Sequence, residues 1–216
     1  ADIKGAGTNA IRIKGVKELS GGRSYSICPD MIEAGTLMIA ATATKGTVTL
    51  HNVMPEHMDA LSMKLTEMGV TVEAMDDSIT VKANVKRVKN TNIKTMPYPG
   101  FPTDLHPQFA TLLSVADGES RITEGVFPTR FQYVEQLQKL GANIQLSGES
   151  AIIKGVPKLI GAPVLPTDLR AAAAMVIAGL MAEGQTTIYN LEYLDRGYED
   201  FIKKLQSLNA VIERGK

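Results

Sequence analysis

One pattern occurs three times along this chain, and such a repeat constrains the fold more than any single motif does. Each copy begins with an aspartate before a run of small and apolar residues, as capped buried helices do, at Asp30, Asp104 and Asp168. Each run ends with a charged residue followed by glycine, at 45–46, 117–118 and 183–184. The repeat therefore predicts three helices in equivalent places in three similar units.

The remainder of the unit is predicted by the residues that follow each glycine. Segments with β-favouring alternation lead into amphipathic helices, and the helical spacing is plain in Phe131, Val134, Leu137 and Leu140. A strand, a tight turn and another strand then follow at 70–83 and at 142–156. One unit therefore consists of a helix, a strand, a second helix and a hairpin.

This order of elements limits the fold class. Parallel crossovers combined with hairpins predict an α/β fold with mixed sheets around shared central helices, rather than a doubly wound sheet. Residues 35–44 and 171–182 are apolar nearly all round, so these two helices are expected to be buried on every side. We expect threefold helix-strand-helix-hairpin repeats around buried helices.

The two ends of the chain are similar to parts of a unit. Residues 1–16 resemble the closing hairpin at 142–156, and the last unit stops after the first strand of its hairpin. We therefore expect a part of a larger protein, in which 1–28 form the closing hairpin and crossover of a missing N-terminal domain. The next domain would be 29–216, in units of about 29–96, 97–165 and 166–216. Another segment should pair with the last strand, because an exposed sheet edge is unfavourable.

Charge and cysteine content exclude several classes of partner. Lysine plus arginine equals aspartate plus glutamate at 23 each, so nothing favours nucleic acid or a membrane surface, and an anion site must be local. No apolar run could span a bilayer, and no secretion signal is present. The single cysteine, Cys28, excludes internal disulfides, is interpreted as a buried structural thiol, and fits a reducing cytoplasm. The histidines show no metal-ligand spacing.

Three arginines are not required by the repeat. A cation in the first turn of a helix opposes the helix dipole, and the sequence predicts such positions for Arg130, Arg170 and Arg196. The positions that match Arg170 in the other units are Ile32 and His106. Helix N-termini with added guanidinium groups predict a site for phosphate or carboxylate at one rim of the domain.

The same residues also have a purely structural interpretation. Each repeated aspartate could serve only as an N-cap. Each arginine has an acid close in sequence, namely Asp168, Glu124 or Asp195, with which it could form an ordinary surface ion pair. The sequence pattern by itself leaves both interpretations open.

Four motifs in order resemble a known family. They are PYPGFPTDLHPQF at 97–109, EGVFPTRF at 124–131, PTDLRAAA at 166–173 and LDRGYED at 194–200. Together they resemble the C-terminal half of the UDP-N-acetylglucosamine 1-carboxyvinyltransferase family, and the resemblance covers essentially the whole chain. It implies the inside-out α/β barrel of the enolpyruvyl transferase, or EPSP synthase-like, type.

The resemblance also implies a reaction. The enolpyruvyl group of phosphoenolpyruvate would move to the 3-hydroxyl of UDP-N-acetylglucosamine through a tetrahedral intermediate, with release of phosphate and without cofactor or metal. This is the first committed step of peptidoglycan synthesis, which takes place in the cytoplasm and serves cell wall biogenesis, cell shape and cell division. The family's cysteine that fosfomycin attacks belongs to the N-terminal half and Cys28 does not match it, so the chain alone should be inactive.

Roles for individual residues follow from the same resemblance. Asp104 in FPTD would be the general base near the sugar hydroxyl, and Asp168 would be a second carboxylate near the reacting centre. Arg170 and Arg196 would hold the phosphate and carboxylate of phosphoenolpyruvate. The resemblance implies a catalytic role for Arg196 as well as for the two aspartates.

The segment GVFPTRF is expected to contact the other substrate. Val126 and Phe127 resemble residues whose backbone and ring contact the nucleotide sugar, with Arg130 supporting them. Two other functions stay open: the enolpyruvyl transferase of the shikimate pathway shares the fold, although DRGYE and FPTD favour the nucleotide-sugar family. A non-catalytic repeat module used for assembly would leave the three arginines unexplained.

Overall fold

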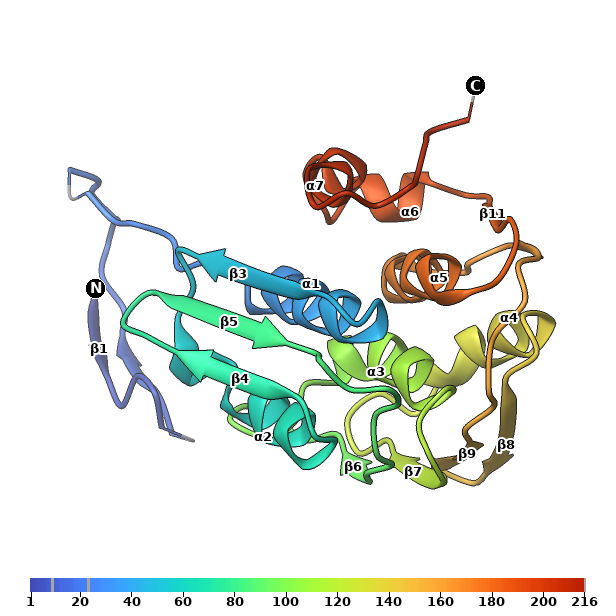
Figure 1. The fold of residues 1–216 in the computed structure, drawn as a ribbon. Coiled ribbons are helices and arrows are strands. Elements are labelled where there is room, and N and C mark those ends of the chain that lie inside the picture. Colours follow the sequence, from blue (N-terminus) through green and yellow to red (C-terminus); the bar gives the residue numbers. More distant parts are fainter. Residues whose placement is uncertain (9, 23, 216) are drawn as a thin grey trace.

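Three apolar helices form the centre of the computed structural model, which describes residues 1–8, 10–22 and 24–215 (Figure 1). They are α1 (Met31–Ala43), α3 (His106–Leu113) and α5 (Leu169–Met181), and each packs against the other two. Small residues allow close approach, because a Cβ added at Gly35 would lie 2.5 Å from Leu105 Cδ1. The prediction of buried helices shared by the repeated units is confirmed.

Two of the three helices begin at capping aspartates, as the sequence predicts. Asp30 accepts the N–H of Ile32 at 2.7 Å, and Asp168 accepts those of Arg170 and Ala171 at 2.8 and 3.0 Å. Each cap satisfies backbone donors that a helix start leaves unpaired.

The second copy begins differently, and the N-cap interpretation is wrong for Asp104. A 3₁₀ helix, η2 (Thr103–Leu105), precedes α3 and contains Asp104. The residue that matches Ala171 in this copy is Pro107, which has no N–H to donate to a capping carboxylate. The carboxylate of Asp104 binds side chains instead, as described below.

The first two units close their sheets with the predicted hairpins. The first sheet has the order β3-β5-β4, and the second has the order β6-β7-β9-β8. In each, the second hairpin strand lies between two antiparallel neighbours. The bounds are Thr47–His51 for β3, Thr71–Ala74 for β4, Ser78–Lys82 for β5, Ile93–Lys94 for β6, Glu119–Thr123 for β7, Asn143–Ser147 for β8 and Ser150–Lys154 for β9.

The second helix of each unit ends in the same backbone conformation. Gly69, Gly141 and Asn209 follow these helices with φ of 92°, 90° and 67°, the left-handed conformation that commonly ends a helix. The helices are α2 (Asp59–Glu67) after η1 (Pro55–His57), α4 (Val134–Lys139) after η3 (Arg130–Tyr133), and α7 (Phe201–Ser207) after α6 (Glu192–Asp195).

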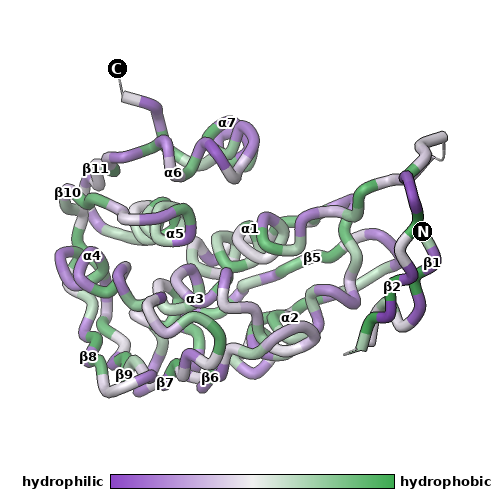
Figure 2. Tube along the Cα trace, turned by 180° about the vertical axis from the view of Figure 1, so that it is seen from behind, coloured by the Kyte–Doolittle hydropathy of each residue, from purple (hydrophilic) through white to green (hydrophobic). Residues whose placement is uncertain are grey.

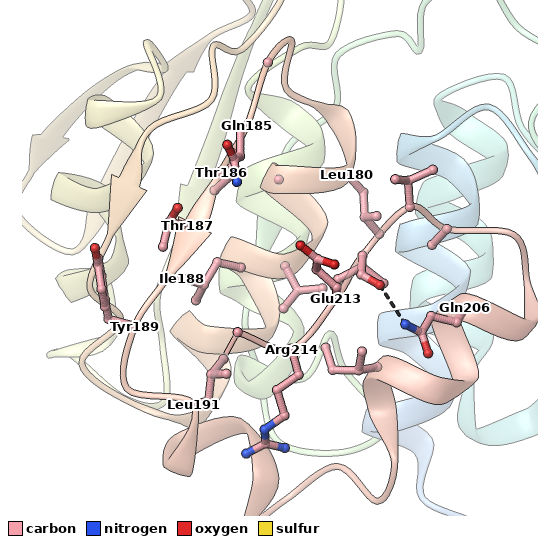
Figure 3. Close-up of a pocket in the computed structure, with 18 of the residues that line it drawn as sticks. Leu180, Gln185, Thr186, Thr187, Ile188, Tyr189, Leu191, Gln206, Glu213 and Arg214 are labelled. Carbon is pink, nitrogen blue, oxygen red and sulfur yellow. Dashed lines mark hydrogen bonds between the residues drawn. The ribbon is translucent and has the colours of Figure 1, made fainter.

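The third unit has a cavity where the other two units have a central strand. Its short strands β10 (Pro163–Val164) and β11 (Thr187–Ile188) pair in parallel, and α7 covers one side of α5. A cavity of about 980 Å³ opens between β11 and the extended segment 210–215 (Figure 3). Leu180 and Gln206 contribute to its walls from α5 and α7.

An antiparallel hairpin precedes the three units. It consists of β1 (Asp2–Lys4) and β2 (Arg12–Lys14), and it lies beyond β3 and β4 at one end of the molecule (Figures 1 and 2). Every described residue up to Cys28 is exposed, so the interpretation of Cys28 as a buried thiol is wrong. Across the described parts of the chain, none of the helices combines the length and apolar character that a membrane crossing requires.

Candidate functional site

Two arginines from different units converge on Asp104. Arg130 Nη2 lies 2.7 Å from Asp104 Oδ1, and Arg170 Nη2 lies 2.9 Å from Oδ2. Arg130 is the first residue of η3 and Arg170 is the second residue of α5. The structure therefore brings these two predicted site residues together, and their partner is Asp104 rather than the acids close to them in sequence.

The guanidinium of Arg170 is fixed from a second side by a buried tyrosine. Its Nη1 is 3.5 Å from the hydroxyl of Tyr198, which also contacts Thr36 at 3.0 Å and Gln108 at 3.3 Å. Burial lowers the pKa of Arg170, but Tyr198 and Asp104 raise it above its usual value overall, so the guanidinium stays charged. Sequence reasoning missed Tyr198, although it lies within the DRGYED motif.

Val126 and Phe127 lie on the surface beside this ion pair. The two residues are 42% and 48% exposed, so they offer apolar and aromatic surface next to Asp104 and its arginines. The guanidinium carbon of Arg130 is 4.6 Å from the centroid of the Phe127 ring, in cation–π contact. Arg130 thus connects the exposed aromatic ring to Asp104, whose side chain is 34% exposed.

Asp168 occupies its predicted position as the N-cap of α5. Both backbone bonds go to Oδ1, so capping occupies one of its two carboxylate oxygens. The structural interpretation therefore applies to Asp168, and a role near the reacting centre remains a prediction.

Arg196 does not open a helix, and the dipole argument for it is wrong. It is the C-cap of α6, and α7 begins only at Phe201. Its guanidinium carbon lies 5.9 Å from the ring centroid of Tyr193, while Asp195 pairs with Arg214. Gly197 must pass close to α5, because an added Cβ would lie 2.5 Å from Leu169 Cδ2. This tertiary contact leaves no room for a side chain at position 197, and no local pattern predicts it.

A buried polar cluster below the ion pair was also missed. Glu124 and His106 have fully buried side chains with 2.7 Å between Oε2 and Nδ1, and the Tyr133 hydroxyl is 2.8 Å from His106 Nε2. Both nitrogens of His106 therefore have partners. The sequence offered only the hint that Glu124 and His106 lie inside two of the quoted motifs. Within the described residues, no group of three or more histidine, cysteine or acidic side chains could hold a metal ion.

Comparisons with known proteins agree with this architecture. A family model described as EPSP synthase (3-phosphoshikimate 1-carboxyvinyltransferase) matches residues 1–205. A UDP-N-acetylglucosamine 1-carboxyvinyltransferase from Clostridium botulinum is 55% identical over 214 residues, which are 99% of this chain and 51% of that protein. One from Desulfofundulus thermocisternus is 49% identical, over 99% of this chain and 88% of that protein. The chain spans about half the length of the first curated relatives that it matches.

Solved structures share the fold. The enolpyruvyl transferase NikO from Streptomyces tendae superposes with a TM-score of 0.79 and 28% identity, over 87% of this chain and 44% of that one. An EPSP synthase from Acinetobacter baumannii, at 20% identity and a TM-score of 0.70 over 86% of this chain and 47% of that one, is similar in fold alone.

The repeated units and these matches confirm the predicted fold, the inside-out α/β barrel of enolpyruvyl transferases. The chain belongs to the EPSP synthase family, among its UDP-N-acetylglucosamine 1-carboxyvinyltransferases.

Proposed function

We propose that this chain forms one wall of the active site of an enzyme that transfers the enolpyruvyl group of phosphoenolpyruvate to the 3-hydroxyl of UDP-N-acetylglucosamine. The observation that supports this most directly is the convergence of Arg130 and Arg170 on the partly exposed carboxylate of Asp104. The names of the relatives supply the nucleotide sugar and the carboxyvinyl group that is transferred, and phosphoenolpyruvate as the donor of that group is part of the proposal. The two functions left open by the sequence, shikimate chemistry and non-catalytic assembly, are less well supported by these relatives.

The ion pairs suggest how the site would respond to a polyanionic substrate. The phosphate and carboxylate of phosphoenolpyruvate would compete with Asp104 for Arg170, because guanidinium binds such groups in bidentate geometry. One oxygen of Asp104 would then be available to take the proton of the sugar hydroxyl as general base. Arg196, which is exposed, would contribute the second cation, and Asp168 would lie nearby as a further carboxylate.

The nucleotide sugar would bind against Val126 and Phe127. Their exposed side chains offer apolar and aromatic area, and the Phe127 ring is held by Arg130. Such a surface beside the proposed base would orient the hydroxyl toward Asp104.

Further parts of the enzyme would complete the site. We infer that 1–28 connect to an N-terminal domain, which supplies the cysteine that fosfomycin attacks, and that 29–216 form the second domain. Closure between the two domains would exclude water from the reaction. The enzyme would act in the cytoplasm at the first committed step of peptidoglycan synthesis, and thus in cell wall biogenesis, cell shape and cell division.

The cavity of the third unit suggests one further contact within the intact enzyme. In the first two units β5 and β9 occupy the equivalent place, between antiparallel neighbours. We propose that an extended segment of the intact enzyme pairs between β11 and residues 211–213 (Figure 3). Amide hydrogen exchange at 187–189 and 211–213 should then be slower in the intact enzyme than in this chain, and equal exchange in both would exclude such pairing.

Phosphate release by the intact enzyme tests the proposed activity. Phosphoenolpyruvate should be consumed with UDP-N-acetylglucosamine and not with shikimate 3-phosphate, whereas this chain alone should show no turnover. Turnover with shikimate 3-phosphate would favour the alternative enzyme, and no turnover with either acceptor would favour the assembly module.

A further inference from the structure

Glu124 is a buried carboxylate that holds a surface turn by its backbone. Its Oε1 accepts the N–H groups of Val126 and Phe127, each at 2.9 Å, and the hydroxyl of Thr95. The same hydroxyl oxygen of Thr95 accepts the N–H of Gly125 at 2.8 Å. Three successive amides of the turn are therefore fixed from below, while the side chains of Val126 and Phe127 point to the surface.

The other oxygen of Glu124 holds the segment that carries Asp104. Its Oε2 accepts the Thr103 hydroxyl at 2.9 Å and His106 Nδ1 at 2.7 Å, so residues on both sides of Asp104 bind the same carboxylate. The Nε of Arg130 lies 3.3 Å from Thr103 Oγ1, which links the arginine to this arrangement. One buried group thus connects the turn at 125–127 with the start of α3.

The protonation states fit these hydrogen bonds. Burial raises the pKa of Glu124, but hydrogen bonds from His106, Thr95 and the two backbone amides outweigh it and lower the pKa to about 2. Burial lowers the pKa of His106, so this histidine is neutral at pH 7, and burial keeps Tyr133 protonated. His106 can then donate from Nδ1 to Glu124 while Nε2 accepts from the Tyr133 hydroxyl.

The repeat itself does not require this carboxylate. The equivalent segments of the other units, GTVTLHNV at 46–53 and GQTTIYNL at 184–191, contain no acidic residue, yet both form a strand there. The chain then passes through a left-handed asparagine, Asn52 with φ 55° or Asn190 with φ 53°, and neither of these units uses a carboxylate. Burying an ionised carboxylate without a charged partner is expensive unless many donors compensate it. The fold can form without a buried carboxylate at this place, and burying one carries a desolvation penalty. The presence of Glu124 therefore indicates a role in the site above it.

We propose that Glu124 is a positioning residue, which fixes the turn at 125–127 relative to Asp104 and so sets the distance between the nucleotide-sugar surface and the proposed base. This inference rests on the proposed function. It assigns to Glu124 no contact with substrate, since the carboxylate is fully buried and acts through the backbone of Val126 and Phe127 and through Thr103.

Two substitutions separate positioning from simple loss of charge. Glu124→Gln keeps an oxygen for Thr95, Val126 and Phe127, and its amide group can donate to Thr103 and, after a change of tautomer, to His106. Glu124→Ala removes the acceptors of five hydrogen bonds and leaves the turn without its anchor. The glutamine variant is therefore expected to restore what the alanine variant loses.

The first measurement needs no catalytic activity. Amide hydrogen exchange of residues 125–127, followed by NMR in this chain, should be slow in the wild type and in Glu124→Gln, and fast in Glu124→Ala. Exchange elsewhere in α3 and α5 reports whether the variant is folded. Slow exchange at 125–127 in a folded Glu124→Ala would overturn the anchoring.

The second measurement uses the intact enzyme. Glu124→Ala should raise the KM for UDP-N-acetylglucosamine by roughly tenfold to a hundredfold, because the freed turn with Val126 and Phe127 would have to be ordered when the sugar binds. The KM for phosphoenolpyruvate should change less than about twofold, and Glu124→Gln should stay close to wild type. Glu135→Ala, which changes an exposed glutamate of α4, is the matched control. Should Glu124→Ala fail to fold, the near-isosteric Thr95→Val removes the acceptor of Gly125 and should show the same selective change.

The outcomes are distinguishable. An unchanged KM for the nucleotide sugar in a folded variant, or an equal rise of both KM values, would overturn the positioning role while leaving the proposed function in place. Absence of turnover in the wild-type enzyme would overturn the proposed function and with it this role, although the exchange measurement would still report on the anchored turn.

Discussion

Arg170 Nη2 lies 2.9 Å from Asp104 Oδ2, although the two residues are 66 positions apart in the chain, Asp104 in η2 before α3 and Arg170 in the first turn of α5. The contact is possible because α3 and α5 pack against each other at the centre of the molecule. It joins a proposed base to a proposed anion-binding cation, and each can be tested separately in the intact enzyme.

Replacement of Asp104 by asparagine should reduce kcat with UDP-N-acetylglucosamine by about 10²- to 10⁴-fold, the usual contribution of general acid–base catalysis. Asparagine keeps the shape of the side chain but cannot take up the proton. Steady-state phosphate release gives kcat, and Asp117→Asn at an exposed ion pair is the control. Full activity of the Asp104 variant would exclude this residue as the base.

Arg196→Gln should separate binding from stability. Arg196 is an exposed residue, so the free energy of unfolding should change by less than about 0.5 kcal/mol. The KM for phosphoenolpyruvate should rise by about tenfold to a hundredfold, because hydrogen bonds to a charged group contribute about 1.5–3 kcal/mol. Urea unfolding and steady-state kinetics measure the two effects, and an unchanged KM would remove Arg196 from the site.

Acid should destabilise the chain through Glu124. Its pKa is lowered from 4.5 to about 2 in the folded protein, so the stabilisation is complete above pH 4.5 and is lost as the pH falls toward 2. The wild type should therefore lose up to about 3 kcal/mol relative to Glu124→Gln across this window. Urea unfolding at several pH values measures the difference, and parallel curves for the two proteins would contradict the lowered pKa.

Gly35→Ala should destabilise the centre of the fold. An added Cβ would lie 2.5 Å from Leu105 Cδ1, and overpacking of this kind typically lowers the free energy of unfolding by about 1–3 kcal/mol. Gly179→Ala in α5 is the matched control, because its nearest contact would be 3.2 Å from Thr186 Cβ and helix propensity favours alanine by about 1 kcal/mol. Equal unfolding midpoints for the two variants would contradict the close packing of α1 on η2.

The sequence predicted well those elements that depend on residues close to one another in the chain. The caps at Asp30 and Asp168, the hairpin turns and the left-handed residues after the second helices all depend on neighbours within a few positions. The repeat then indicated that the central helices are buried together, since their apolar faces have no other place to pack.

Long-range contacts of the site could not be predicted in the same way. The sequence placed Glu124 near Arg130, but the structure pairs it with His106, and it pairs Arg130 with Asp104. Such partners are selected by how the units pack, and several chemically suitable partners were available to each residue. The helix start assigned to Arg196 was wrong in a related way, because α7 begins only at Phe201 and Gly197 packs against Leu169, a contact that local sequence does not predict.

Pro107 distinguishes the second unit from the third at the start of the central helix, because it stands where the third unit has Ala171. Asp168, in the same three-letter context of proline, threonine and aspartate, is bound by two backbone amides, one of which has no counterpart at position 107. Because Pro107 has no backbone N–H, the carboxylate of Asp104 lacks one of the two donors that cap the helix at Asp168. In a molecule built from copies of one unit, equivalent aspartates therefore bind different groups, which are backbone amides at Asp168 and the side chains of Arg130 and Arg170 at Asp104.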